Sequence, residues 1–288
     1  MGSVIQYKDL SRQITIIENE LDGYEEILSQ LNTSVGAKVI GITGPPGAGK
    51  STLLNALISE LCIKHKVAVI AVDPSSPFSH GALLGDRLRM MQHHNNSNVY
   101  IRSLATRGVL GGLSAKTMEV ADLCRNAGFD YVFIETVGVG QSEMEIVSLA
   151  DVTVLVLVPE SGDDIQAMKA GIMEAADMYV INKHDRDGAD RLFLHLSNLL
   201  QMHHKPATIL KTSAINNEGI LQLLSMIEKA LENPNENTLL DKVYLRVMHL
   251  LYGQCRKKIN SLDFRHQLEE EIKSGNFNIH KFVKNIRF

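Results

Sequence analysis

An octapeptide early in the chain has the composition and spacing of a phosphate-binding loop. Residues 44–51 read Gly-Pro-Pro-Gly-Ala-Gly-Lys-Ser and fit the pattern G-x-x-x-x-G-K-[ST]. Glycines let the backbone turn its N–H groups toward phosphate oxygens, and the start of a following helix adds partial positive charge. Lys50 is expected to reach the β- and γ-phosphates, as a candidate catalytic residue, and Ser51 to hold Mg²⁺. The predicted phosphate-binding residues are Gly44, Pro45, Pro46, Gly47, Ala48, Gly49, Lys50, Ser51 and Thr52.

The flanking segments favour this prediction over a simple glycine turn at a helix start. Residues 39–43 form an apolar, β-branched run that indicates a buried strand, and residues 52–61 carry leucine and alanine at helical spacing. A simple turn would need neither Lys50 nor Ser51. Strand, loop and helix therefore follow one another in the order that phosphate binding requires.

A second motif indicates guanine rather than adenine. Residues 182–185 read Asn-Lys-His-Asp, an N-K-x-D pattern that follows the apolar run 178–181. The Asp185 carboxylate can accept hydrogen bonds from the ring N–H and the exocyclic amine of guanine, a donor pair that adenine lacks. Asn182 and Lys183 are expected to brace the loop and cover the base.

The segment after the next predicted strand supports the same nucleotide. This segment reads Thr212-Ser213-Ala214, and the Ala214 backbone N–H could donate to the guanine oxygen, so Ser213 and Ala214 are counted in the site. His184 occupies the variable position of N-K-x-D and is expected to face solvent. Together these features predict GTP or GDP as the ligand.

An acidic residue at the end of a third strand is a candidate for the metal side of the site. Where GTPases carry D-x-x-G, this chain has Glu135-Thr136-Val137-Gly138. Glu135 keeps the negative charge and is expected to face Mg²⁺ through water and to take part in catalysis, while the Gly138 N–H meets the γ-phosphate. Loss of that phosphate would release residues 138–145, which predicts a switch.

The residue after Gly138 bears on the rate of hydrolysis. Val139 stands where Ras-like proteins place a water-orienting glutamine, so the isolated protein is expected to hydrolyse GTP slowly. Gln141 and Glu143 lie near enough to help, and Gln141 is the catalytic candidate of the two.

The segment between Lys50 and Glu135 is long for a small Ras-type domain and contains two more acids. Asp73 ends a predicted strand, 67–72, that is expected beside the phosphate-loop strand, where it could orient water or Mg²⁺. Asp86 could approach the metal when GTP is bound and is also a catalytic candidate. For each acid a helix cap or an ion pair is the alternative. The predicted metal set is Ser51, Asp73, Asp86 and Glu135.

Strand-like and helix-like segments alternate from residue 38 onward. The predicted strands are 38–43, 67–72, 99–103, 131–135, 152–158, 178–182 and 207–210. The predicted helices between them are 83–92, 114–127, 163–175, 189–203 and 218–231. Several strands are almost wholly apolar, which predicts an α/β fold with a doubly wound, mostly parallel sheet and the ligand at the carboxyl ends of its strands.

The two ends of the chain differ from this middle part. We expect an N-terminal helical extension over residues 1–36 that packs on the outside of the core, a GTPase domain over 37–233 and a helical arm over 234–288. Residues 240–252 of the arm form a dense apolar face. A partner subunit in a homodimer is the favoured cover for that face, and packing on the chain's own core is the alternative.

Composition excludes several classes of function. The 288 residues have a formal net charge of −4, so clustered basic charge for nucleic-acid binding is not expected. The odd set of Cys62, Cys124 and Cys255 has no C-x-x-C pair, which favours a reducing compartment and argues against a structural zinc site. Without an apolar signal core or a membrane-spanning run, the cytoplasm is the expected location and no membrane partner is expected.

These motifs, in this order, resemble the GTPase group associated with methylmalonyl-CoA mutase, the MeaB/ArgK-type proteins, from about residue 8 to the end. The segments that carry the resemblance are 41–52, 72–76, 85–87, 105–108, 111–113 and 135–143. Glu135 in place of aspartate is usual in this group. The resemblance implies a SIMIBI-like P-loop GTPase that gates adenosylcobalamin loading and protects an adenosylcobalamin-dependent acyl-CoA mutase, as a homodimer joined through its C-terminal helices.

One segment departs from the family pattern. The family usually has G-D-E-L-Q-G-I-K after the fifth strand, whereas residues 162–169 read Gly-Asp-Asp-Ile-Gln-Ala-Met-Lys. That loop is implicated in signalling to the partner, so Gln166 and Lys169 are candidates for a relay, with a plain helix start as the alternative.

Two other functions fit the motifs less well. A nickel-insertion GTPase would need Cys and His ligands, but the pairs 93–94 and 203–204 are histidines without cysteine neighbours and are expected at the surface. An ATPase that energises transport of basic amino acids is disfavoured by N-K-x-D.

Overall fold

The computed structural model describes most of the chain. The described residues are 6–32, 36–73, 91–93, 95–105, 115–136, 142–162, 170–202, 208–233, 236–260 and 264–273. By their internal contacts the residues divide into two units, 1–242 and 243–288, which are treated separately below.

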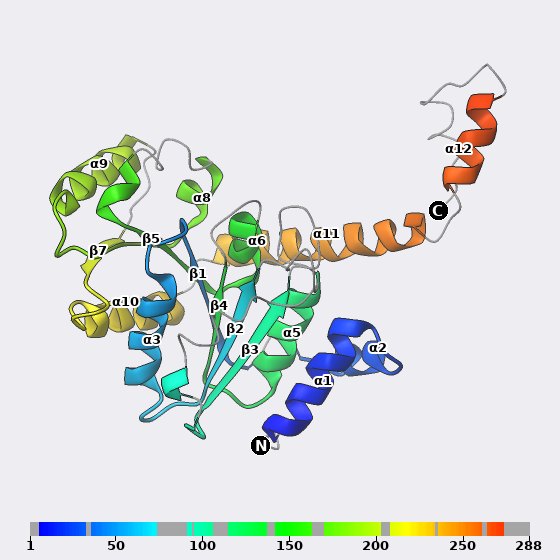
Figure 1. The fold of residues 1–288 in the computed structure, drawn as a ribbon, viewed down its shortest axis with the longest axis horizontal. Coiled ribbons are helices and arrows are strands. Elements are labelled where there is room, and N and C mark those ends of the chain that lie inside the picture. The colour runs from blue at the N-terminus through cyan, green and yellow to red at the C-terminus, as the bar shows by residue number, and fades with distance from the viewer. Residues whose placement is uncertain are drawn as a thin grey trace. The chain divides into compact units, whose positions relative to one another are not determined.

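In the described part of the chain, seven parallel strands form one sheet (Figure 1). The strands are β1 (Lys38–Thr43), β2 (Val67–Asp73), β3 (Val99–Ala105), β4 (Tyr131–Glu135), β5 (Val152–Leu157), β6 (Met178–Asn182) and β7 (Thr208–Thr212). Their order is β3-β2-β4-β1-β5-β6-β7, and each neighbouring pair is parallel. The predicted doubly wound α/β fold is confirmed.

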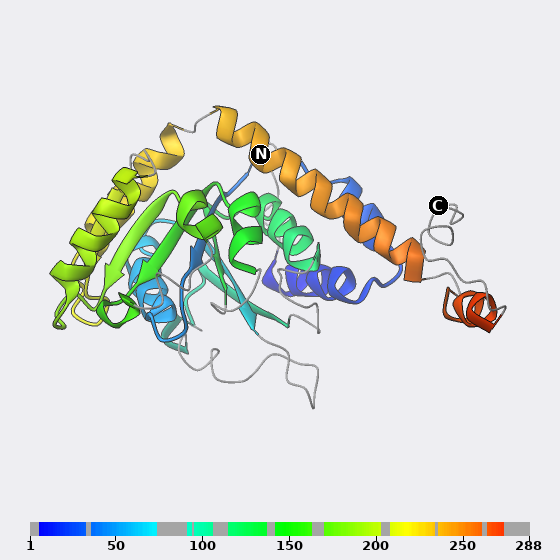
Figure 2. The ribbon, with the colours of Figure 1, turned by 90° about the horizontal axis from the view of Figure 1, so that it is seen from above.

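Helices cover both faces of this sheet, which explains why its strands are apolar on both sides (Figure 2). The helices α3 (Lys50–Leu61) and α10 (Ile220–Glu232) share one core cluster with the strands. The other cluster contains residues of α5 (Ala115–Asn126), α6 (Ser142–Leu149), α8 (Ala170–Ala175) and α9 (Ala189–Met202). Two short 3-10 helices are η1 (Met91–His93) and η2 (Pro159–Gly162). Most of the predicted helix 83–92 lies outside the described residues.

The N-terminal segment forms two helices, α1 (Tyr7–Asn19) and α2 (Tyr24–Ser29). Between them the backbone takes left-handed conformations at Glu20 (φ 50°) and Gly23 (φ 88°), which ends the first helix. The α1 side chains Leu10, Ile14 and Ile17 are fully buried in the core cluster that contains α5, α6, α8 and α9. Leu21 is 49% exposed because it follows the end of α1.

A buried lysine near the start of α11 (Glu236–Asn260) belongs to the first unit. The Lys242 Nζ donates to the carbonyl oxygens of Ala150 (3.2 Å) and Asp151 (3.0 Å) and lies 3.3 Å from the Asp177 carboxylate. Ala150 directly follows α6, so the ammonium group lies at the carboxyl end of that helix, where a positive charge is favourable.

The rest of α11 is followed by α12 (Phe264–Lys273). Large apolar side chains are exposed along α11, namely Leu240, Val243, Tyr244, Leu245, Val247, Leu251 and Tyr252. Within the described residues, no helix combines the length and the apolar character needed to cross a bilayer.

The burial of α1 has a measurable consequence. Ile14→Ala should lower the free energy of unfolding by about 2–5 kcal/mol, because it leaves a cavity under a fully buried side chain. Leu21→Ala, at the exposed position beyond the helix, should change it by less than about 0.5 kcal/mol. Urea denaturation of both variants measures the difference, and equal losses would contradict the packing of α1 into the core.

Candidate nucleotide-binding site

The phosphate-binding loop connects β1 to α3, and close backbone contacts require two of its glycines. A Cβ on Gly44 (φ 138°) would lie 2.1 Å from the carbonyl oxygen of Val156 in β5. A Cβ on Gly49 (φ 84°) would lie 2.5 Å from the side-chain nitrogen of Asn182 in β6. These glycines therefore let the loop lie directly against the neighbouring strands, independently of any phosphate.

The lysine of the loop is held inside it. Lys50 is 7% exposed, and its Nζ donates to the carbonyl oxygens of Gly44 (2.8 Å) and Pro45 (3.0 Å). The tip of the loop, at Pro46 and Gly47, is exposed. The loop thus encloses a positive charge beneath an accessible backbone turn.

The hydroxyl of Ser51 contacts the acid predicted for the metal site. Ser51 Oγ donates to Glu135 Oε1 at 2.6 Å, and both residues are buried. Glu135 ends β4 and pairs in register with Ile42 of β1, so the acid lies beside the phosphate-loop strand. Adjacent hydroxyl and carboxylate oxygens are ligands that suit Mg²⁺, so the residues present fit such an ion.

The prediction that Asp73 lies beside the phosphate-loop strand is wrong. Asp73 ends β2, and β4 lies between β2 and β1 because it pairs with both strands. Glu135 of β4 takes the neighbouring position instead.

The amide of Asn182 joins three segments of the site. Its Nδ2 donates to the carbonyl oxygen of Ala48 in the phosphate-binding loop at 3.0 Å. Its Oδ1 accepts hydrogen bonds from Thr212 Oγ1 (3.2 Å) and from the Ala214 backbone N–H (3.1 Å). Asn182 is 2% exposed, so these bonds are shielded from water. The N–H that was expected to face guanine is therefore engaged by Asn182 in this structure.

Lys183 makes a second link to the same loop. Its backbone is left-handed (φ 56°), and its Nζ donates to the carbonyl oxygen of Gly47 at 2.7 Å. The structure thus brings the phosphate motif and the N-K-x-D motif, which are far apart in sequence, into direct contact.

Asp185 is exposed, and its neighbour Ser213 is buried. A hydrogen bond from the Ser213 side chain to this carboxylate lowers the pKa of Asp185 below its ordinary value of 3.8. The group is therefore a hydrogen-bond acceptor throughout the neutral range, as recognition of two donors requires.

His184 is partly exposed, and its ring also contacts an acid of the loop after β7. Its Nε2 lies 2.7 Å from Glu218 Oε2, and its side chain is 31% exposed. Glu218 was not predicted as part of the site, because no motif includes it and only the folded loop after β7 brings it to His184. An ion pair of Arg186 with Glu160, at 2.5 Å, joins the same loop to η2 and is likewise not predicted by any motif.

Several predicted residues lie outside the described residues. They are Asp86, Gly138, Val139, Gln141, Gln166 and Lys169. The first unit nevertheless places the ends of β1, β4, β6 and β7 at one edge of a parallel sheet, with the described site residues on them.

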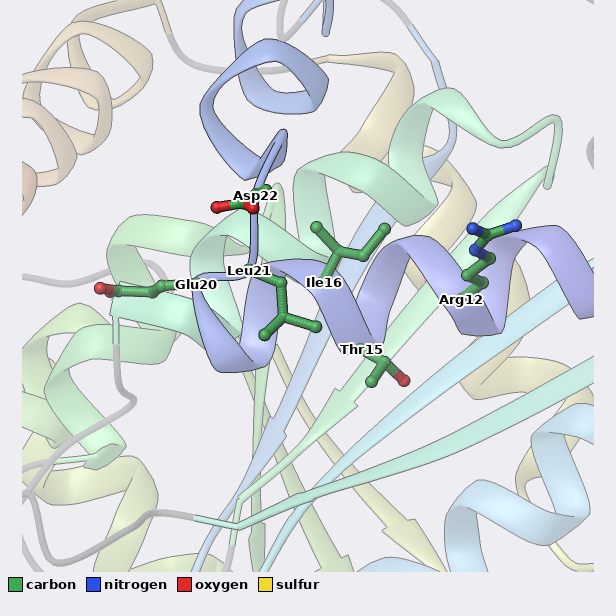
Figure 3. A pocket seen from close by; sticks show the side chains of 6 residues that line it. All are labelled: Arg12, Thr15, Ile16, Glu20, Leu21 and Asp22. Atoms are coloured by element: carbon green, nitrogen blue, oxygen red, sulfur yellow. The ribbon is translucent and has the colours of Figure 1, made fainter.

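A hollow of about 630 Å³ lies elsewhere, along α1 and the turn after it (Figure 3). Its lining residues are Arg12, Thr15, Ile16, Glu20, Leu21 and Asp22, none of which belongs to the nucleotide motifs.

Within the described ranges, no group of three or more His, Cys, Asp or Glu side chains is arranged to hold a metal ion. His93, expected at the surface, is instead 6% exposed, and burial lowers the pKa of its ring.

The fold and these motifs define the chain as a P-loop GTPase. It is similar to a crystal structure described as an LAO/AO transport system kinase, with 24% identity, a TM-score of 0.62 and coverage of 98% of this chain and 97% of that one. Nickel-bound HypB from Helicobacter pylori is 18% identical, with a TM-score of 0.51 over 79% of this chain and 97% of HypB. Both likenesses concern the fold alone.

The chain belongs to the family described as "Methylmalonyl Co-A mutase-associated GTPase MeaB", which residues 10–263 match. A protein of Pyrococcus abyssi named as a GTPase is 46% identical over 76% of this chain and 70% of its own length. The GTPase ArgK of Escherichia coli is 42% identical over 62% of this chain and 56% of its own length. The mouse mitochondrial "Methylmalonic aciduria type A homolog" is 41% identical over 64% and 46%, respectively. The predicted family and the predicted GTPase activity are confirmed.

The contact between Ser213 and Asp185 predicts a pH effect. Ser213→Ala should raise the pKa of Asp185 toward 3.8, because it removes the hydrogen bond that favours the ionised form. Since the wild-type pKa is depressed, the bond contributes at neutral pH and is lost as the pH falls through that pKa. An NMR titration of the Asp185 carboxyl carbon measures the shift, and Ser59→Ala, in α3, should leave it unchanged. A wild-type pKa in Ser213→Ala would contradict the assigned contact.

Proposed function

We propose that GTP and GDP bind with their phosphates at residues 44–51 and their base at Asp185. The observation that carries this proposal is the pair of contacts from the guanine motif to the phosphate loop, Asn182 to Ala48 and Lys183 to Gly47. They hold the two motifs in one rigid arrangement, as one nucleotide spanning both would require. The short distance from Ser51 to Glu135 supports a metal position at the phosphate end.

The described residues have separate expected roles in GTP hydrolysis. Lys50 places positive charge under the loop, where it favours negative charge that develops on the phosphates. Ser51 and Glu135 would hold Mg²⁺, which neutralises phosphate charge when bound. Asp86 and Gln141 remain predicted catalytic residues, and Val139 remains the reason to expect slow hydrolysis without a partner.

Replacing the base-selecting carboxylate should change nucleotide preference. Asp185→Asn exchanges an acceptor for an amide that can donate to the 2-oxo group of xanthine. We expect GTP to bind about 10- to 100-fold more weakly, the size of one lost charge-assisted hydrogen bond, and XTP to bind more tightly than to wild type. Calorimetry with GTP, XTP and ATP measures all three affinities.

Asp187→Ala is the matched control, because it removes one negative charge from an exposed position of the same loop. Its nucleotide preference should equal that of wild type. Unchanged GTP and XTP affinities in Asp185→Asn would overturn the assignment of the base site.

We further propose that the GTPase cycle serves an adenosylcobalamin-dependent acyl-CoA mutase, with methylmalonyl-CoA mutase first among the candidates. The family description and the mouse relative named for methylmalonic aciduria support this role. The chain would gate adenosylcobalamin loading and protect the mutase, which requires different affinities for the mutase in the GTP and GDP states. The exposed apolar side chains of α11 support a homodimer joined through the C-terminal helices.

A pull-down in defined nucleotide states tests the partner. The full chain should retain a methylmalonyl-CoA mutase to different extents with GDP and with a non-hydrolysable GTP analogue. Asp185→Asn should show the same dependence with xanthosine nucleotides and not with guanosine ones. Absence of any mutase in both states would remove the chaperone role and leave the GTPase activity intact.

A further inference from the structure

The two loops that flank the proposed base site are joined on their outer side by one pair of side chains. His184, in the guanine motif after β6, lies 2.7 Å from Glu218, at the end of the loop after β7. On the inner side, the same loops are joined by the buried Asn182 and by the His184 backbone N–H, which donates to the Thr212 carbonyl oxygen at 3.1 Å. The loops are therefore bonded at both edges.

Within the loop after β7, Glu218 and Ser213 are joined by backbone hydrogen bonds. The Ser213 N–H donates to the Glu218 carbonyl oxygen at 3.1 Å, and the Glu218 N–H donates to the Ser213 carbonyl oxygen at 3.0 Å. Left-handed backbone at Asn217 (φ 59°) and Gly219 (φ 75°) closes the turn. Because of this two-bond bridge, a displacement of Glu218 displaces Ser213 with it.

Ser213 in turn contacts the carboxylate proposed to select the base. Its side chain donates to Asp185, the residue immediately after His184. The contacts therefore form a closed ring that runs from His184 to Glu218, through the bridge to Ser213, and back to Asp185. A ring of this kind restricts the orientation of Asp185 more than the single hydrogen bond from Ser213 would.

We propose that His184 and Glu218 are positioning residues that hold Asp185 in the orientation needed to retain guanine nucleotides. The inference rests on the base site proposed above and adds the pair that holds its two loops together. An isolated ion pair at the surface contributes little to stability. The contact between His184 and Glu218 joins loops that are already bonded on their inner side. We therefore expect its loss to shorten the lifetime of the bound nucleotide and to change the stability of the fold little.

The dissociation rate of ribose-labelled GDP from the full chain tests the proposal. His184→Ala and Glu218→Ala should each raise that rate about three- to tenfold, the effect of one lost hydrogen bond, and the double variant should raise it no further. His184→Gln and Glu218→Gln, which keep a donor and an acceptor at the same reach, should stay within about twofold of wild type. Asp187→Ala, which also removes one negative charge, should match wild type.

The outcomes separate this inference from the base site itself. Additive effects in the double variant, no rescue by glutamine, or an equal rise in Asp187→Ala would overturn the positioning role. Wild-type rates in the alanine variants would also overturn it, while a xanthine preference in Asp185→Asn would still support the base site. If Asp185→Asn binds guanine nucleotides like wild type, the base site fails and the inference fails with it.

Discussion

The nucleotide site depends on the side-chain amide of Asn182. The nitrogen of this group donates to the phosphate-binding loop, and its oxygen accepts from two groups of the segment after β7. An amide is suited to this position because it offers a donor and an acceptor on one rigid plane. A carboxylate would leave the Ala48 carbonyl oxygen without its donor in a buried place, which is costly. One side chain thus fixes the separation between the phosphate-binding loop and the segment after β7, to which we assign the two ends of the nucleotide.

This amide can reach the loop only because of the sheet order and the glycines of the loop. β5 lies between β1, which leads into the loop, and β6, which ends in Asn182. Gly44 lets the backbone pass within contact of β5 at Val156, and Gly49 leaves room for the Asn182 side chain. Both glycines of the G-x-x-x-x-G-K-[ST] pattern therefore serve contacts within the protein, in addition to any role toward phosphate.

Sequence patterns were sufficient for the elements and the motifs because these are local. Continuous apolar runs marked the strands, and G-x-x-x-x-G-K-[ST] and N-K-x-D marked the two ends of the site. The order of strands is not local, so the sequence wrongly predicts Asp73 beside the phosphate-loop strand, where the structure has β4. The contact of His184 with Glu218 likewise depends on a turn with left-handed residues, which the spacing of apolar residues does not predict.

The buried ammonium group of Lys242 has a mechanical consequence. It bonds the carbonyl oxygens of Ala150 and Asp151, which directly follow α6, and the first residues of α6 belong to the segment 138–145 that is expected to respond to the γ-phosphate. A sliding of α6 along its axis by even one ångström would stretch these bonds beyond hydrogen-bonding distance unless the first turns of α11 followed. The first residues of α11, up to Lys242, are therefore coupled to the carboxyl end of α6 within the first unit.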